Sequence, residues 1–323
     1  MDFLLSDIHD DLASSVDTLL TKADTPAVAR EWADGDQAPA AGVFRQLADI
    51  GVFGLLINEE HGGAGAGAVE MVVALEQIGR HALPGPIVES VAVAPILLRS
   101  ATDSDALDAA ASGRLSSAAI APLSPRAADT DAAERVYVVD NGVLSLATVD
   151  DTAQSVDPTR TVSTVRPDEA IAEGVDGDRA AQFGALATAA QLLGLGSTML
   201  RIASDYALSR KQFGRQIGSF QAVKHHLADV AIALEMARPL VHGAAVGIDG
   251  GVPDGVDVGR DISAAKVAAA DAAYLASRRS LQVLGAIGYT SEHDLSLYIT
   301  KTRALVSAWG TPAQHRARIL ESL

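Results

Sequence analysis

The chain has 323 residues, of which 48% are hydrophobic, so it can bury a substantial core divided between two or three structural units. Its formal net charge of −16 excludes a nucleic-acid partner, because phosphates would be repelled unless a local basic patch reversed the field. The absence of cysteine excludes disulfides and thiolate metal sites.

Sequence patterns at the N-terminus also bear on location. No run of 18 apolar residues occurs, and Met1-Asp2-Phe3 is followed by early acidic residues rather than by the basic segment of a signal peptide. We therefore expect a cytoplasmic protein that does not enter a membrane.

The first 112 residues are predicted to be helical. Leu4, Ile8, Leu12, Val16 and Leu20 recur every four residues, which indicates one face of a helix. Further helical runs are expected over 43–50, around 71–78 and over 87–112. The glycine-rich stretch 63–67 lacks the third glycine of a dinucleotide-binding loop, so we interpret it as a loop between helices.

The pattern changes over 113–172. Short alternating apolar runs, 136–139 and 143–146, lie between Pro, Gly, Asn and Asp residues and predict strands and turns. Twelve acidic residues face four basic ones between 129 and 179, which favours a solvated surface. We expect a small β-domain here, between helical domains at 1–112 and 173–323.

Helical periodicity returns from about 179. Long helices are predicted over 220–241 and 262–284, enough for a four-helix bundle. The predicted fold class is therefore mainly α with a small β insert.

A carboxylate-rich bundle raises the alternative of a di-iron protein, which needs Glu-x-x-His motifs. No Glu in this sequence is followed by His three residues later. His225 and His226 are adjacent, so on a helix they point in different directions and cannot share a metal. No metal site is expected.

The segment from Tyr206 to Asp229 is the most informative part of the chain. Arg210 lies beside a glycine turn between two long helices, where its planar charged fork is well placed for an anion. A surface salt bridge at a helix end explains the same residue equally well.

Several motifs resemble the acyl-CoA dehydrogenase family. The run Arg210-Lys-Gln-Phe-Gly214, with Phe220-Gln221 and a later Leu-Ala-Asp, is similar to the family's R-x-Q-F-G…F-Q…LAD signature. The run 282–292 is similar to Q-x-x-G-G-x-G-Y-x-x-E, and 57–65 resembles the P-E-x-x-G-G-x-G loop. The resemblance spans nearly all the chain except 113–172.

This resemblance implies an N-terminal helical domain, a middle β-domain and a C-terminal four-helix bundle. Family members remove two hydrogens from an acyl-CoA thioester, with a Glu taking the α-proton and FAD accepting the hydride. FAD lies across a subunit interface, and the C-terminal domain of one subunit binds the ADP end of FAD held by its neighbour. The matching residues in this chain are Arg210, Gln212, Phe213, Gln221, Gln282, Gly285 and Ala286, where Ala286 replaces a usual glycine.

Other family features are missing. Neither T-E-P-x-x-G-S-D-like nor K-x-x-I-T-N-like segments occur in 113–172, so the flavin-ring cradle is not visible. The usual position of the catalytic Glu holds Trp309, and the alternative position, 29 residues before Phe213, holds Gly184. Neither residue can accept a proton, so we expect no catalytic residue in this chain.

The resemblance therefore predicts the shorter, non-catalytic subunit of a heterotetrameric actinobacterial acyl-CoA dehydrogenase acting on a steroid-derived thioester. Its partner would have intact flavin and Glu motifs, share FAD with this chain, bind most of the acyl-CoA and reduce an electron-transfer acceptor. Two alternatives remain: a self-sufficient enzyme with a displaced base such as Glu292 or Glu235, and a non-enzymatic helical scaffold.

Overall fold

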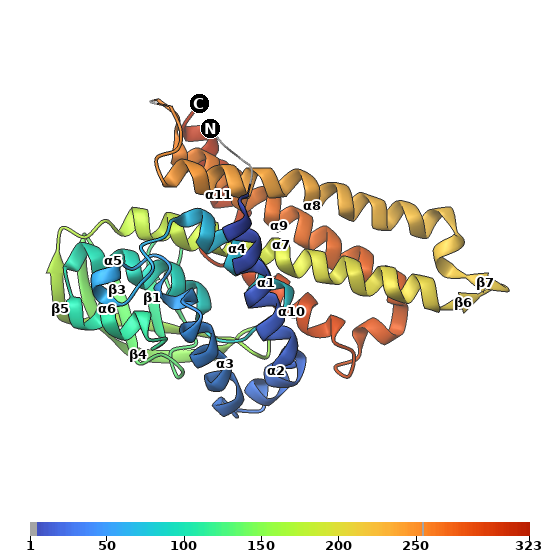
Figure 1. The fold of residues 1–323 in the computed structure, drawn as a ribbon, viewed down its shortest axis with the longest axis horizontal. Helices are drawn as coiled ribbons and strands as arrows, with labels where there is room; N and C mark the ends of the chain where they lie inside the picture. Colours follow the sequence, from blue (N-terminus) through green and yellow to red (C-terminus); the bar gives the residue numbers. More distant parts are fainter. Residues whose placement is uncertain (1–4, 254) are drawn as a thin grey trace.

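The structure is a computed structural model that describes residues 5–253 and 255–323. Met1-Asp2-Phe3 and Leu4, the first residue of the predicted helical stripe, lie outside the described residues. Helices dominate both ends of the chain, and one mixed sheet lies between them in sequence (Figure 1).

The N-terminal part is helical, as predicted, but contains more elements than the periodicity indicated. The first stripe belongs to α1, and a separate helix, α2, follows it after a left-handed residue at Asp24. The run 87–112 is divided into a π-helical segment and two α-helices. The elements are α1 (Asp7–Lys22), α2 (Thr25–Ala33), α3 (Ala38–Asp49), η1 (Val52–Gly54), η2 (Glu59–His61), α4 (Ala68–Arg80), η3 (Glu89–Val93), α5 (Ala94–Ala101) and α6 (Ser104–Ala111).

The middle segment forms a five-stranded sheet in the order β1-β3-β4-β5-β2. β1 and β3 are parallel, and the other neighbouring pairs are antiparallel. Asn141 and Gly142, both with positive φ, make the tight turn between β3 and β4. The strands are β1 (Ser116–Ile120), β2 (Ala127–Ala128), β3 (Arg135–Asp140), β4 (Val143–Gln154) and β5 (Thr161–Glu173), the last two much longer than the apolar runs that predicted strands here.

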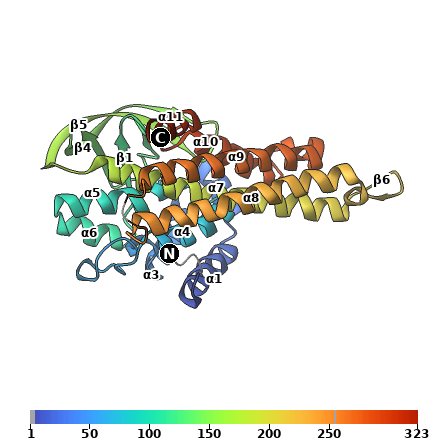
Figure 2. The ribbon, with the colours of Figure 1, turned by 90° about the horizontal axis from the view of Figure 1, so that it is seen from above.

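The C-terminal part is a bundle of long helices. The long helices run side by side and project away from the sheet, and a small hairpin lies at the projecting end (Figures 1 and 2). The elements are α7 (Gly177–Ser209), β6 (Lys211–Gln212), β7 (Arg215–Gln216), η4 (Ile217–Ser219), α8 (Gln221–Ile248), α9 (Val258–Leu284), η5 (Gly285–Tyr289), α10 (Leu295–Ser307) and α11 (Pro312–Glu321).

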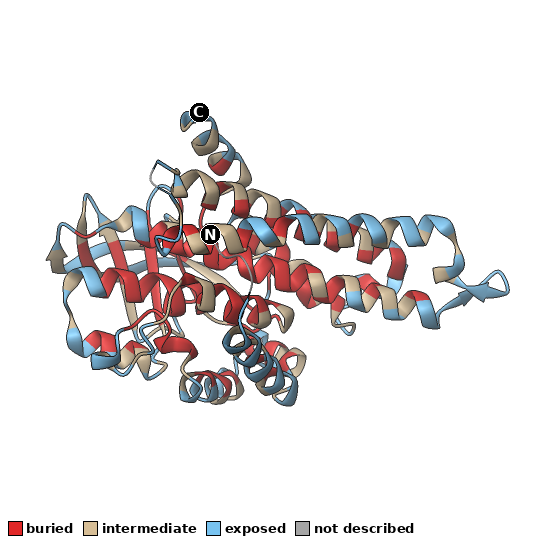
Figure 3. Ribbon diagram, turned by 45° about the horizontal axis from the view of Figure 1, so that its top comes forward, coloured by how far each residue is buried: buried red, intermediate tan, exposed pale blue. Residues whose placement is uncertain are grey.

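Helix α7 is the central element of the core. Its first two thirds are buried almost without interruption, while its last turns are exposed at the projecting end (Figure 3). Gly194 faces α4, where an added Cβ would collide with the Glu76 carbonyl oxygen. Gly79 of α4 faces α7 in the same way, against the backbone of Gln191. The two helices therefore cross with their backbones in contact.

Among the residues that the structure describes, two helices, α7 and α8, are long and apolar enough to span a membrane by length and composition. In α7, 89% of the most apolar 18-residue stretch is buried inside the protein, as expected for a helix of the core. The corresponding window of α8 is 39% buried, because one face of that helix is exposed.

We expect Gly194→Ala to lower the free energy of unfolding, because the new methyl group must separate two helices that touch through their backbones. Overpacking of this kind costs about 1–3 kcal/mol, more than the roughly 0.5–1 kcal/mol gained by removing a glycine from a helix. The measurement is chemical denaturation. The control is Gly42→Ala in α3, where no atom lies within 4 Å of the added Cβ; equal stability of the two variants would contradict the prediction.

Candidate functional site

The two positions at which the resemblance places a catalytic Glu are in contact. Trp309 follows α10, and Gly184 lies in α7. A Cβ added to Gly184 would lie 2.7 Å from Cε3 of the Trp309 indole, so the ring packs directly on the glycine backbone. Trp309 is 1% exposed. The indole therefore occupies the space next to the vacant position in α7.

A buried carboxylate lies against this indole. Trp309 Nε1 donates a hydrogen bond to Glu89 Oε1 at 3.0 Å. Glu89 is 2% exposed, and its Oε2 has no hydrogen-bond partner among the described residues. Arg160 lies 3.8 Å from Oε1 and supplies a positive charge. Sequence reasoning missed Glu89, although a single Glu inside the apolar run 87–98 was a visible signal.

The backbone at Trp309 is in the left-handed region, with φ of 52°. Such a conformation costs a bulky residue about 1–3 kcal/mol unless its surroundings hold it in place. His315 Nε2 lies 2.9 Å from the Trp309 carbonyl oxygen, which can only accept, so Nε2 carries the proton. Lys266 Nζ donates to the Val306 carbonyl at 3.0 Å and the Gly310 carbonyl at 3.4 Å. These bonds fix the turn that carries the indole.

Burial changes the protonation of both supporting groups. It lowers the pKa of His315 to about 4, so the imidazole is neutral at pH 7 and can accept from Ser263 Oγ, 3.2 Å from Nδ1. Burial also lowers the pKa of Lys266 to about 7. The turn is therefore supported by groups whose charge is suppressed by burial.

A second buried ion pair joins α10 to the sheet. Lys301 Nζ lies 3.1 Å from Asp157 Oδ2, and Asp157 also accepts from the backbone and hydroxyl groups of Thr159. Nearby, burial raises the pKa of Asp129 to about 6, although Arg160 opposes the shift. The turn between β4 and β5 is thus attached to α10.

A cavity of about 530 Å³ opens beside Trp309. Three segments line it: the loop between β1 and β2, the β4–β5 turn with the start of β5, and the end of α10 with the two residues after it. Arginine is its only charged residue type, with Arg126, Arg160 and Arg303 contributing one side chain each.

The predicted nucleotide contacts around Arg210 gather at the projecting end of the bundle. Gln212 and Phe213 belong to the β6–β7 hairpin, which Arg210 leads into, and Gln221 begins α8. All four are exposed, and Phe213 is 91% exposed with φ of 52°. The segment 206–226 contains four Lys or Arg residues and no acidic residue. The hairpin therefore presents to solvent an aromatic ring and cations that form no ion pair with other described residues.

Gln282, Gly285 and Ala286 are also exposed but lie farther back along the bundle, at the end of α9 and in η5. Ser280 bonds to the Met199 carbonyl of α7, and Arg210 is eleven residues beyond Met199. At 1.5 Å per residue Ser280 is therefore about 16 Å from Arg210 along the helix axis, and Gln282, Gly285 and Ala286 follow Ser280 toward the projecting end. The structure therefore divides the predicted contacts into two exposed groups.

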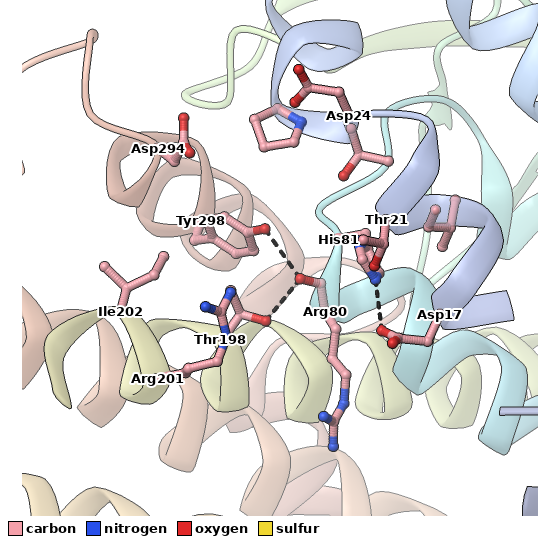
Figure 4. Close-up of a pocket in the computed structure, with 13 residues that line it drawn as sticks. Asp17, Thr21, Asp24, Arg80, His81, Thr198, Arg201, Ile202, Asp294 and Tyr298 are labelled. Carbon is pink, nitrogen blue, oxygen red and sulfur yellow. Dashed lines mark hydrogen bonds and ion pairs between the residues drawn. The ribbon is translucent and has the colours of Figure 1, made fainter. Parts of the chain in front are cut away.

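A cavity of about 590 Å³ lies elsewhere, between the N-terminal helices and α7 and α10 (Figure 4). The hydroxyl groups of Thr198 and Tyr298 donate to the Arg80 carbonyl there, and His81 bonds to Asp17. This cavity contains none of the predicted site residues.

Neither of the two glutamates that were predicted as alternative catalytic bases lies beside Trp309. Glu235 is exposed on α8 and pairs with Arg238, and Glu292 is exposed before α10. The carboxylate that lies against Trp309 is that of Glu89.

The shifted pKa of His315 predicts a pH dependence of stability. Between about pH 6.5 and pH 4 the unfolded chain protonates His315 while the folded chain does not, so the free energy of unfolding falls as the pH falls. His315→Gln removes this contribution, so the stability gap between wild type and variant should narrow by about 3 kcal/mol from pH 7 to pH 4. Denaturation at several pH values measures the gap, and a constant gap would disprove the assignment.

Comparison with known proteins identifies the family. Residues 6–106 match the acyl-CoA dehydrogenase N-terminal domain, and residues 178–323 match the acyl-CoA dehydrogenase C-terminal domain. The chain is 29% identical over 313 residues to the acyl-CoA dehydrogenase IpdE2 of Mycobacterium tuberculosis. The aligned region covers 95% of each of the two chains.

Two solved structures show the same fold. A chain of the ChsE4-ChsE5 complex from Mycobacterium tuberculosis superposes with a TM-score of 0.84 and 22% identity, covering 99% of this chain and 98% of that one. A chain of the Tcur3481-Tcur3483 steroid ACAD, in its G363A variant, gives a TM-score of 0.83 and 22% identity, covering 98% and 97%.

The fold class expected from the sequence is thereby confirmed. The matched domains place the chain among FAD-dependent oxidoreductases that act on CH–CH bonds. The protein belongs to the acyl-CoA dehydrogenase family.

Proposed function

We propose that this chain is the non-catalytic subunit of a cytoplasmic heterotetrameric acyl-CoA dehydrogenase. In this proposal it contacts the ADP end of FAD held by a catalytic partner, and the partner supplies the Glu base and binds most of the acyl-CoA. The observation that carries the proposal is the Trp309–Gly184 contact, because one indole occupies the space where either base would act.

The exposed residues at the end of the bundle support the shared cofactor. Within the described residues, Arg210 makes no side-chain hydrogen bond or ion pair. An exposed arginine beside an exposed phenylalanine fits a nucleotide, whose phosphates meet the guanidinium while a planar group meets the ring. Arg210, Gln212, Phe213 and Gln221 would hold one part of FAD, and Gln282, Gly285 and Ala286 another. When bound, FAD supplies the hydride acceptor.

The partner and substrate class are supported by the related proteins. Two structural neighbours are two-component assemblies by name, and one is described as a steroid ACAD. We propose a steroid-derived acyl-CoA as the substrate of the complex, and an electron-transfer protein as the acceptor of its electrons.

We also propose the division into domains at 1–112, 113–172 and 173–323. The helix α6 ends at Ala111, the strands occupy 116–173, and α7 begins at Gly177. The second boundary falls one residue before the end of β5.

Reconstitution tests the shared cofactor. We expect the chain purified alone to be colourless and inactive, and the co-expressed complex with its partner to carry flavin and to oxidise an acyl-CoA. Absorbance at the flavin wavelengths and dye reduction measure the two properties. One flavin per isolated chain would overturn the proposal.

Arg210→Ala in the complex tests the assigned contact. Removing a charge-assisted hydrogen bond of about 1.5–3 kcal/mol should weaken FAD retention by about tenfold or more. The measurement is flavin content after dialysis. Arg201→Ala is the matched control, because Arg201 is an exposed arginine on α7 paired with Asp205. Equal flavin loss in both variants would count against a specific role of Arg210.

A second candidate function is a self-sufficient dehydrogenase with Glu89 as a displaced base. The observation in its favour is the unpartnered Oε2 of Glu89 beside Trp309. Against it, Glu89 is 2% exposed and bonded to the indole, so no substrate carbon can approach without moving Trp309. Turnover by the isolated chain, abolished by Glu89→Gln, would establish this function in place of the first.

A further inference from the structure

A further cavity, of about 450 Å³, lies where the N-terminal helices meet the start of α7 and the end of α8. We propose that it binds a small carboxylic acid with a compact aliphatic body, whose carboxylate lies between Arg99 and Arg179. This binding requires neither FAD nor a partner subunit, so it is independent of the proposed function.

The cavity is distinct from the one beside Trp309, because the two share no lining residue. Both adjoin α7, but the Trp309 indole packs on Gly184, whereas Phe183 lines the cavity proposed as a site. Consecutive residues of a helix point about 100° apart, so α7 presents different faces to the two cavities. The predicted nucleotide contact Arg210 follows the opposite end of α7.

Two arginines supply the positive charge of the cavity. Arg99 of α5 donates to the Leu56 carbonyl at 3.4 Å, and Arg179, in the first turn of α7, donates to the Ile248 carbonyl at 3.1 Å. The Arg179 guanidinium also lies 5.4 Å from the centre of the Phe183 ring. Both arginines are exposed, and neither forms an ion pair with another described residue. Each guanidinium is thus held by one N–H group, while its other donors remain free for an anion.

The one acidic residue that lines the cavity limits the charge that the ligand can carry. Asp249 accepts from the backbone amide of Ala68 at 2.8 and 2.9 Å and from that of Val69 at 3.3 Å. Its carboxylate is therefore satisfied by the N-terminus of α4. Two guanidinium groups and one carboxylate leave a single excess positive charge, which suits a monoanion better than a doubly charged phosphate.

The rest of the lining favours an organic acid over a free ion. Four aliphatic side chains from separate segments converge on the cavity, namely Leu56, Ala66, Ile96 and Ile248. The volume of about 450 Å³ lies in the range of small-molecule sites and exceeds what a free carboxylate group fills. Because the aliphatic groups surround the cavity and do not form one continuous groove, a compact body fits better than a long chain.

Three compounds that differ in one property each test the proposal. Adamantane carboxylate has a charge and a compact aliphatic body, adamantane carboxamide lacks the charge, and acetate lacks the body. In calorimetric titration of the full chain we expect the carboxylate to bind saturably, the carboxamide to bind about tenfold more weakly, and acetate not to bind. Because the cavity exists only in the folded chain, the carboxylate should also raise the melting temperature.

Each compound can contradict one part of the proposal. Absence of saturable binding by adamantane carboxylate would overturn the whole of it. Equal affinities for the carboxylate and the carboxamide would overturn the role of the arginines. Acetate binding as tightly as adamantane carboxylate would overturn the contact with the aliphatic wall.

Substitutions assign the binding to this cavity. Arg99→Gln and Arg179→Gln should each raise the dissociation constant for adamantane carboxylate about fivefold or more, because each removes one charged fork. Arg166→Gln is the matched control, because Arg166 is an exposed arginine of β5 that pairs with Asp150 and does not line the cavity. Equal effects of the three substitutions would mean that the ligand responds only to the overall charge of the chain, which would refute the site.

The same titration separates this cavity from the other exposed arginines. Arg303→Gln alters the cavity beside Trp309, and Arg210→Ala alters the hairpin. Both substitutions should leave the dissociation constant for adamantane carboxylate unchanged. Loss of binding in either variant, with no effect of Arg99→Gln, would place the ligand elsewhere and overturn the assignment.

Discussion

The close crossing of α4 and α7 determines how the rest of the molecule is arranged. Gly79 and Gly194 let two helix backbones touch, and this contact joins the N-terminal helices to the bundle. Because α7 is enclosed on several sides, most of its inward positions are small residues, and alanine is the commonest of them. Because a helix packed in this way is rigid, it fixes the positions of the segments attached to its two ends.

The two ends of α7 have different chemistry. Its buried first half places Gly184 against the Trp309 indole, in a region where the charged groups Glu89, Arg160, Asp157 and Lys301 are buried and paired. Its exposed end leads into a hairpin with unpaired positive charge. Removing one member of a buried pair leaves an uncompensated charge, whereas the exposed cations remain solvated and available to a partner.

The long helices, the position of the sheet and the family could be predicted from the sequence, because helical periodicity and ordered motifs are local signals. The separate helix α2, the π segment at Glu89 and the length of β4 and β5 depend on tertiary contacts and gave no such signal. The resemblance predicted that Trp309 and Gly184 stand at two Glu positions, but not that they touch, since 125 residues separate them. Glu89 was visible only as a single carboxylate in an apolar run, and its contact with Trp309, 220 residues away, left no local signal.

The contact between Trp309 and Gly184 also has an evolutionary consequence. A glutamate introduced at Gly184 would collide with the indole. A glutamate introduced at Trp309 would leave a void beside the glycine and remove the one hydrogen-bond donor that the Glu89 carboxylate has among the described residues. Neither single step gives a well-packed protein with a base in place, because each position is fitted to the other. A substitution that introduces a carboxylate at either position therefore has to be accompanied by a change at the other, so the two positions are constrained to change together.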